Sequence, residues 1–292
     1  MVKYEFLGKE TLDRAEVLGM LDPEFRQWVK RPENREHCLL LAAMEGDNLV
    51  GLIVADAAED SPIAHIQSLF IKPEKQGEGI GFSLLSHLEL KLNKMGVIKV
   101  TIEIPETPET LSLLKRAHFS APIRLFENFF FDLSHFNPPW YENPGRLPAN
   151  FSLVPWEEMT PADKSALLIY GKNEGILLSG RDSNFPVEPL NSYLLKHKDE
   201  IAGWMETHRM DKNTINYSHL FLFPEWRFKR LAIPLLAKAI RTQADSEVPI
   251  AFFELNLAET PTAWQNFIKK RLRPHSDTNY FTLYSNKILN VL

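Results

Sequence analysis

The chain reads FIKPEKQGEGIG from Phe70 to Gly81, and this stretch joins two runs with different hydrophobic spacing. The apolar run Ala64 to Ile71 predicts a strand, and the leucines between Leu84 and Leu92 recur at helical spacing. Glycines at such a turn let the backbone come close to a ligand, and the free amides at a helix start attract an anion. The stretch therefore predicts a strand, an anion-binding turn and a helix.

The segments on either side extend this pattern. Residues His37 to Met44 and Leu49 to Ala55 are apolar runs separated by turn formers, which is typical of a hairpin. Gly96 stands where a left-handed cap would end the helix, and Val97 to Ile104 predicts another strand. The order strand, helix, strand favours a right-handed crossover between parallel strands.

The pattern occurs twice in the chain. A shift of 151 positions sets Ser68 to Glu74 against His219 to Glu225, and the same shift aligns the leucine pairs that follow. Prolines and a glycine make the sequence irregular between Asp132 and Asn150, which is typical of a linker. We therefore expect an N-terminal domain over 1–136, a linker over 137–150 and a C-terminal domain over 151–292.

Composition narrows the class of protein. The 292 residues are 44% hydrophobic, enough for two cores, and the net charge of −5 argues against general binding to nucleic acid. The single cysteine, Cys38, excludes an internal disulfide framework. The first residues lack the apolar core of a signal peptide, and no run is long and apolar enough to cross a membrane. We expect a cytoplasmic protein.

The turn also carries a family motif. Gln76, Gly79 and Gly81 meet the pattern Gln/Arg-x-x-Gly-x-Gly/Ala, which resembles the acetyl-coenzyme A signature of the GNAT superfamily of N-acetyltransferases. The resemblance covers Tyr4 to Phe131 and, more weakly, Phe151 to Tyr284. It implies an α+β fold of two GNAT-like domains, each a mixed, curved β-sheet flanked by helices. Two strands of the sheet would splay apart and admit the pantetheine arm.

The resemblance also implies that acetyl-CoA is the cosubstrate, and it indicates which residues would contact it. We expect no metal ion. The pyrophosphate would be bound by backbone amides of Gln76, Gly77, Glu78, Gly79, Ile80 and Gly81. The pantetheine would pair with the backbone of Leu69, Phe70 and Ile71. A bulky residue at position 79 would block the phosphate or strain the turn.

The second copy departs from the motif, because Arg230 replaces the required glycine. We expect a degenerate domain there, which serves structure, the walls of the substrate site or a partner. Arg227, Lys229 and Arg230 are alternatively an anion site of another kind, or a solvated basic face.

Acetyl transfer needs a group that accepts a proton from the amine. His65 is the first candidate, since an imidazole with an unperturbed pKa near 6.5 accepts a proton at neutral pH. Glu103 on the next strand is the second candidate. Strand alternation predicts His65, Gln67 and Leu69 on one face. Alignment with the family places Leu114 where many members carry an acidic tyrosine, which leaves water or a linker side chain such as Tyr141 as the leaving-group acid.

These features favour a GNAT-type N-acetyltransferase that moves an acetyl group from acetyl-CoA to a primary amine of a small molecule or a peptide. The missing tyrosine favours an alternative, a GNAT-fold binding or regulatory protein without turnover. A dinucleotide-dependent enzyme is a third interpretation of the glycine-rich turn. The sequence does not specify the acceptor or the oligomeric state.

Overall fold

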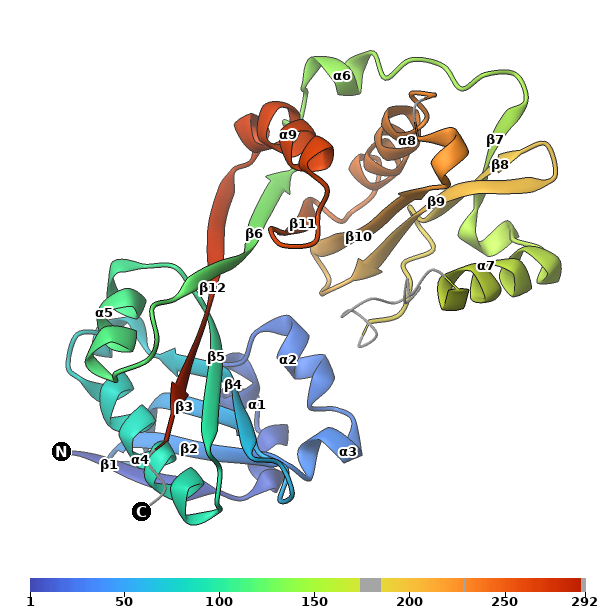
Figure 1. Cartoon of the computed structure of the whole chain (residues 1–292). Helices are drawn as coiled ribbons and strands as arrows, with labels where there is room; N and C mark the ends of the chain where they lie inside the picture. The colour runs from blue at the N-terminus through green and yellow to red at the C-terminus, as the bar shows by residue number, and fades with distance from the viewer. Residues whose placement is uncertain (174–184, 228, 290–292) are drawn as a thin grey trace. The chain divides into compact units, whose positions relative to one another are not determined.

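A computed structural model of the chain describes residues 1–173, 185–227 and 229–289 (Figure 1). The chain divides into two compact units. Unit 1 comprises Met1–Phe126 together with Tyr280–Leu292, and unit 2 comprises Glu127–Asn279. The end of the chain therefore belongs to the same unit as its beginning, whereas the expected domains assigned it to the second half.

Unit 1 is built on a mixed sheet in the order β1-β2-β3-β4-β5-β12. Its strands are β1 (Val2–Leu7), β2 (Cys38–Glu45), β3 (Asn48–Asp56), β4 (Ile63–Ile71), β5 (Lys99–Pro105) and β12 (Thr278–Ile288). The expected hairpin is β2–β3, which is joined by a tight turn at Gly46. Neighbouring strands run antiparallel except β4 and β5, which are parallel and are connected through a helix, as the sequence predicts.

Helices cover both faces of this sheet. One face packs against α4 (Ile80–Lys94) and α5 (Pro108–Arg116), and the other against η1 (Lys9–Asp13), α1 (Ala15–Gly19) and α2 (Pro23–Trp28), which α3 (Pro32–Arg35) follows. The leucines of α4 at 84, 85, 88 and 92 are fully buried against the sheet. Gly96, with φ of +82°, follows this helix as the left-handed residue that the sequence predicts.

The two parallel strands separate beyond a short ladder. Their pairing covers Ile63–Ile66 of β4 and Lys99–Ile102 of β5, so no ladder pair between them follows Ile66 in these fully described strands. At the same point β4 carries a bulge, because Ile66 pairs with Ala55 and Ser68 with Val54 while Gln67 is extra. The splayed strands that the resemblance implies are therefore present in unit 1.

Unit 2 repeats the plan with the sheet order β6-β11-β10-β9-β8-β7. Its strands are β6 (Ile123–Asp132), β7 (Phe151–Pro155), β8 (Tyr193–His197), β9 (Glu200–Arg209), β10 (Thr214–Leu222) and β11 (Ile250–Asn256). Its helices are α6 (Pro139–Glu142), η3 (Trp156–Glu158), α7 (Pro161–Asn173), η4 (Pro224–Trp226), α8 (Ala232–Ala244), α9 (Thr262–Arg271) and η5 (Arg273–His275). The parallel pair β10–β11 has an equally short ladder, over Thr214–Asn216 and Ile250–Phe252.

Details of the two units agree at the offset of 151 residues. The short helix η2 (Pro73–Lys75) corresponds to η4, and the residue after each makes the same contact. The Gln76 side-chain amide donates to the carbonyl of Ile71 at 3.2 Å, and Arg227 Nε donates to the carbonyl of Leu222 at 3.1 Å.

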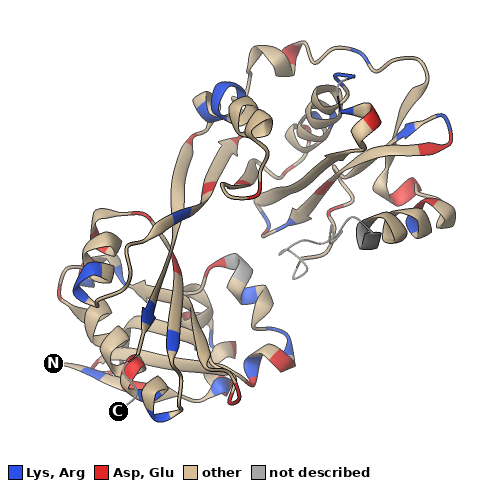
Figure 2. Cartoon of the chain, viewed as in Figure 1, with Lys and Arg blue, Asp and Glu red and all other residues tan. Residues whose placement is uncertain are grey.

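Acidic and basic residues are interspersed along both units (Figure 2). No helix of the described residues has the length and apolar character needed to span a bilayer.

Candidate active site

The glycine-rich turn of unit 1 is open to a ligand. Gly77 and Gly79 both have φ of +82°, and a Cβ added to either would meet no heavy atom within 4 Å. Gln76, Gly77 and Glu78 are exposed, so this turn is not buried against neighbouring side chains. The turn is therefore open where side chains at positions 77 and 79 would otherwise lie.

Gly79 is also the residue that precedes the first turn of α4. No side chain caps this helix start and no acidic residue lies in its first turn. The first amides of a helix have no partner within it, and the helix dipole adds partial positive charge there. Open backbone amides and a left-handed glycine fit a phosphate group without a basic side chain.

Side chains around the turn hold its shape. The Lys75 ammonium lies 2.7 Å from Glu45 and 3.8 Å from Glu78. The hydrogen bond from Lys75 lowers the pKa of Glu45, and the same bond raises the pKa of Lys75. Lys75 is thus engaged with carboxylates, which leaves the amides as the main anion donors of the turn.

One cation lies beside the helix start. The Arg116 guanidinium, at the end of α5, sits 4.9 Å from the ring centroid of Phe82 in the first turn of α4. A Cβ on Gly81 would lie 3.6 Å from Leu113, so α5 packs close to this end of α4. No local sequence signal points to Arg116, because its proximity to the turn depends on how the two helices pack.

The separated strands offer a backbone edge next to the turn. Leu69, Phe70 and Ile71 pair with β3 on one side and lie beyond the end of the β5 ladder on the other. A strand edge of this kind accepts an extended ligand with amide groups by adding a further strand. The three residues proposed for pantetheine therefore lie where such pairing is possible.

The bulge changes which residues share a face. Ile66 and Leu69 both contact the core on the α4 side, while Phe70 contacts the opposite core. The expectation that His65, Gln67 and Leu69 share one face is therefore wrong. The extra residue shifts the alternation by one position, which strand periodicity alone does not predict.

His65 lies on the face opposite α4, at the end of the parallel ladder. The Nδ1 atom of His65 is 2.5 Å from the Thr101 hydroxyl on β5. On its other side, His65 is the cross-strand partner of Asp56 on β3. Burial raises the pKa of the Asp56 carboxyl, an effect that His37 and His65 partly offset. The structure thus brings together His65, Thr101 and Asp56. Hairpin register could have identified Asp56, but the sequence alone does not establish that register.

The second candidate for the base, Glu103, lies on β5 beyond the end of its ladder with β4. Its cross-strand partner on β12 is Tyr284.

Leu114, at the position where the family alignment expects a tyrosine, is buried in the core on the α4 side of the sheet. Tyr141 packs in unit 2, where the Arg241 guanidinium lies 5.3 Å from its ring. Tyr284 is therefore a tyrosine that the fold supplies to unit 1 from a distant part of the sequence, and no local sequence signal points to it.

The equivalent turn of unit 2 keeps one left-handed residue but not its glycine. Arg230 has φ of +58°, the left-handed conformation that Gly79 adopts in unit 1. The neighbouring cations lie over aromatic rings: Lys229 is 4.3 Å from the Trp226 centroid and Arg227 is 5.9 Å from that of Phe221. Phe228, which the alignment also places here, lies outside the described residues.

Among the described residues, no group of His, Cys, Asp and Glu could hold a metal ion.

Comparisons with known proteins agree with this geometry. The family model of the GNAT acetyltransferase family matches residues 7–119. Those residues, which contain the open turn and the separated strands, therefore belong to the GNAT acetyltransferase family. No curated protein sequence matches the chain.

Solved structures extend the likeness to the whole chain. A tandem GNAT protein from the clavulanic acid biosynthesis pathway superposes with a TM-score of 0.64 at 14% identity, covering 99% of each chain. A GCN5-related N-acetyltransferase from Sphaerobacter thermophilus gives a TM-score of 0.61 at 12% identity, covering 99% of this chain and 96% of that one. The chain as a whole thus has the tandem GNAT fold.

A third structure matches over part of its length. It is a GCN5-related glucosamine N-acetyltransferase region in a fungal multi-domain GH3 β-N-acetylglucosaminidase, with a TM-score of 0.62 and 10% identity. The match covers 98% of this chain and 38% of that one. At such identities these likenesses show the fold alone.

Proposed function

We propose that unit 1 transfers an acetyl group from acetyl-CoA to a primary amine of a small molecule or a peptide. The observation that carries this proposal is the open turn at Gly77 and Gly79, which ends at the uncapped start of α4 beside the separated strands. The GNAT family match over residues 7–119 supports the same chemistry.

The proposal gives each part of the site a role. Amides of Gln76 to Gly81 bind the pyrophosphate, and the open edge at Leu69 to Ile71 pairs with pantetheine. Arg116 adds a cation for a further phosphate of the same molecule. These contacts hold the thioester at the point where β4 and β5 separate.

The acceptor amine must lose a proton to attack the thioester carbon. His65 takes that proton directly or through a water, and its contact with Thr101 fixes the orientation of the imidazole. Glu103 remains the second candidate for this base. Tyr284, across from Glu103, is the tyrosine of unit 1 that we propose to protonate the leaving thiolate.

Titration calorimetry with coenzyme A tests the binding step. Gly79→Arg places a large side chain in the open space and at a left-handed position, so we expect loss of measurable binding. Gly96→Arg is the matched control, because Gly96 has the same φ of +82° and the same open surroundings at the other end of α4. Equal affinity in both variants would place the phosphates elsewhere.

A binding or regulatory protein without turnover is the second candidate, favoured by burial of Leu114 where many members carry the tyrosine. A thiol-release assay over a panel of small and peptide amines separates the two. Sustained production of coenzyme A with any acceptor excludes a purely regulatory role. Binding of coenzyme A without thiol release across the panel supports it.

A further inference from the structure

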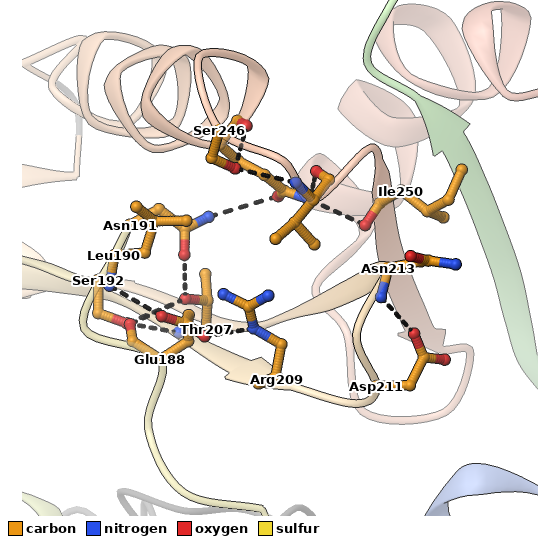
Figure 3. Close-up of polar contacts among 12 residues, drawn as sticks. Glu188, Leu190, Asn191, Ser192, Thr207, Arg209, Asp211, Asn213, Ser246 and Ile250 are labelled. Atoms are coloured by element: carbon orange, nitrogen blue, oxygen red, sulfur yellow. Dashed lines mark hydrogen bonds and ion pairs between the residues drawn. The ribbon is translucent and has the colours of Figure 1, made fainter.

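Unit 2 buries polar groups on both faces of β9. On the α8 face Ser192, Asn191 and Thr207 form a buried network (Figure 3), and Gln243 accepts a hydrogen bond from Asn191 at 3.5 Å. Thr207 Oγ1 lies 2.6 Å from Asn191 Oδ1 and 3.0 Å from Ser192 Oγ, and Gln243 Nε2 donates to the carbonyls of Val248 and Ile250. These groups satisfy one another, so this network is explained as structure.

The opposite face of β9 carries a different set. Trp204 contacts the core under α7, and strand alternation puts Glu206 and His208 on that same face. Glu206 and His208 are both 0% exposed, and neither Glu206 oxygen has a hydrogen-bond partner among the described residues. Burial of a carboxylate without donors costs several kcal/mol, so this side chain needs a physical explanation.

The groups on the α7 face are connected in a line. His208 Nε2 lies 3.2 Å from Glu206 Oε1, close enough for an ion pair although not aligned for a hydrogen bond. His208 Nδ1 lies 2.6 Å from the hydroxyl of Ser218 on β10. Ser218 is only partly buried, so it forms the accessible end of the line. Carboxylate, imidazole and hydroxyl in this order form an arrangement that activates a serine nucleophile.

A bulge sets the position of Ser218. Asn216 pairs with His208 and His219 pairs with Glu206, so Tyr217 and Ser218 both stand against Thr207. The extra residue turns Ser218 toward His208, and a bulge leaves one residue's backbone groups outside the ladder.

The internal repeat shows that this set belongs to unit 2 alone. At the repeat offsets of 151 and 152 residues, Glu206 corresponds to Val54, His208 to Asp56 and Ser218 to Gln67. Unit 2 thus lacks the glycine of the turn and carries an acid, an imidazole and a hydroxyl at positions where unit 1 has Val54, Asp56 and Gln67.

We propose that Ser218 is a nucleophile that accepts an acyl group from a thioester or an activated ester. His208 Nδ1 takes the hydroxyl proton while Ser218 Oγ bonds to the acyl carbon. The bond from that carbon to the sulfur or oxygen of the leaving group breaks, and His208 passes its proton to the leaving group. Glu206 is a positioning residue that orients the imidazole and stabilises its charged form.

Acylation is tested on the full chain with p-nitrophenyl acetate as the probe, followed by peptide mass spectrometry. We expect one acetyl group on the peptide that contains Ser218, loss of this label in Ser218→Ala, and unchanged labelling in Ser165→Ala, an exposed serine of α7. His208→Gln should slow labelling about 100-fold or more. Glu206→Gln should slow it less and shift its pH profile. No label on Ser218, or equal rates with and without His208, would overturn the proposal.

A second experiment tests the same arrangement without p-nitrophenyl acetate. Ser218→Cys introduces a thiol beside His208, and iodoacetamide reports its reactivity against pH. The single natural cysteine adds little background, because Cys38 is buried and burial raises its pKa to about 12. We expect the introduced thiol to titrate below the usual pKa of about 8.5 and to return toward it when His208→Gln is added. A thiol that titrates normally in both variants contradicts the proposal.

The Gly79→Arg variant separates acylation of Ser218 in unit 2 from coenzyme A binding in unit 1. Gly79→Arg should abolish coenzyme A binding by the phosphate turn and leave labelling of Ser218 unchanged. Loss of both activities in that variant, with the fold intact by circular dichroism, would mean that Ser218 depends on the cofactor of unit 1 and would overturn an independent centre.

Discussion

The glycine-rich turn of unit 1 and the corresponding turn of unit 2 place different residues at one left-handed position. Gly79 adopts φ of +82° without penalty, while Arg230 holds φ of +58° at the corresponding turn. His118, after α5, is a further left-handed residue that is not glycine. A side chain at a left-handed position costs about 1 kcal/mol or more, so each of these residues stores strain.

Arg230→Gly should therefore stabilise the protein by about 1 kcal/mol, because glycine adopts the left-handed conformation without a Cβ clash. His118→Gly is a parallel case at the end of α5, with an expected gain of the same size. Urea unfolding measures both. A loss of stability in either variant would show that the side chain contributes more than its strain costs.

The role of His65 is tested by His65→Gln, which removes the proton acceptor and keeps a polar group near Thr101. We expect turnover to fall about 10²- to 10⁴-fold with little change in coenzyme A affinity. His87→Gln is the control, since His87 lies on α4 and contacts the carbonyl of Ser83. Wild-type turnover in His65→Gln would transfer the role of base to Glu103.

Individual strands and helices are largely predictable from the sequence. The hairpin β2–β3, the strand β4, the helix α4 and its cap at Gly96 follow from spacing and turn residues, which are local signals. The bulge at Gln67 does not, because the extra residue is visible only when partners across the sheet are known. The same limit hides Asp56 and Tyr284, whose neighbours come from cross-strand register.

Asp277 fixes the junction of η5 and β12 to the end of β6 within unit 2. One carboxylate oxygen accepts from the Asp132 amide at 2.6 Å, and the other lies 2.7 Å from His135 Nε2. The hydrogen bond from the Asp132 backbone amide, and after it the hydrogen bond from His135, keep the pKa of Asp277 below its ordinary value. The hydrogen bond to Asp277 raises the pKa of His135.

These shifts set a pH window for the contribution of this contact. The Asp277 part is present above the ordinary carboxyl pKa of 3.8 and is lost as pH falls through the lowered folded value. The His135 part is complete below the ordinary pKa of 6.5 and is lost as pH rises through the raised folded value. Asp277→Asn should therefore reduce stability most between about pH 4 and 6.5. Urea titrations at pH 5.5 and pH 9 measure this, and an equal effect at both would contradict it.

At the scale of the whole molecule, the chain order and the compact units do not coincide. Tyr280–Leu292 belongs to unit 1, where β12 pairs with β5 from Thr282 to Ile288. Leu283 and Leu289 are buried in the same core as α4. The sequence shows two similar halves but not this exchange, because strand pairing between residues 177 to 189 positions apart has no local signal.

Removal of residues 280–292 should therefore damage unit 1 rather than unit 2. Loss of the buried leucines at 283 and 289 alone would cost roughly 4 kcal/mol or more. Hydrogen exchange with mass spectrometry should show β4, β5 and α4 losing protection, together with loss of coenzyme A binding. Full protection of these elements in the shortened chain would contradict the assignment of β12 to unit 1.

The late position of β12 also has a consequence for biosynthesis. A ribosome that has translated every residue of the glycine-rich turn still holds a nascent chain in which the sheet of unit 1 lacks the strand next to β5. Unit 1 is complete only after residue 288 has been translated, so a chain that stops between the turn and β12 would carry the glycine-rich motif without the strand that completes its core.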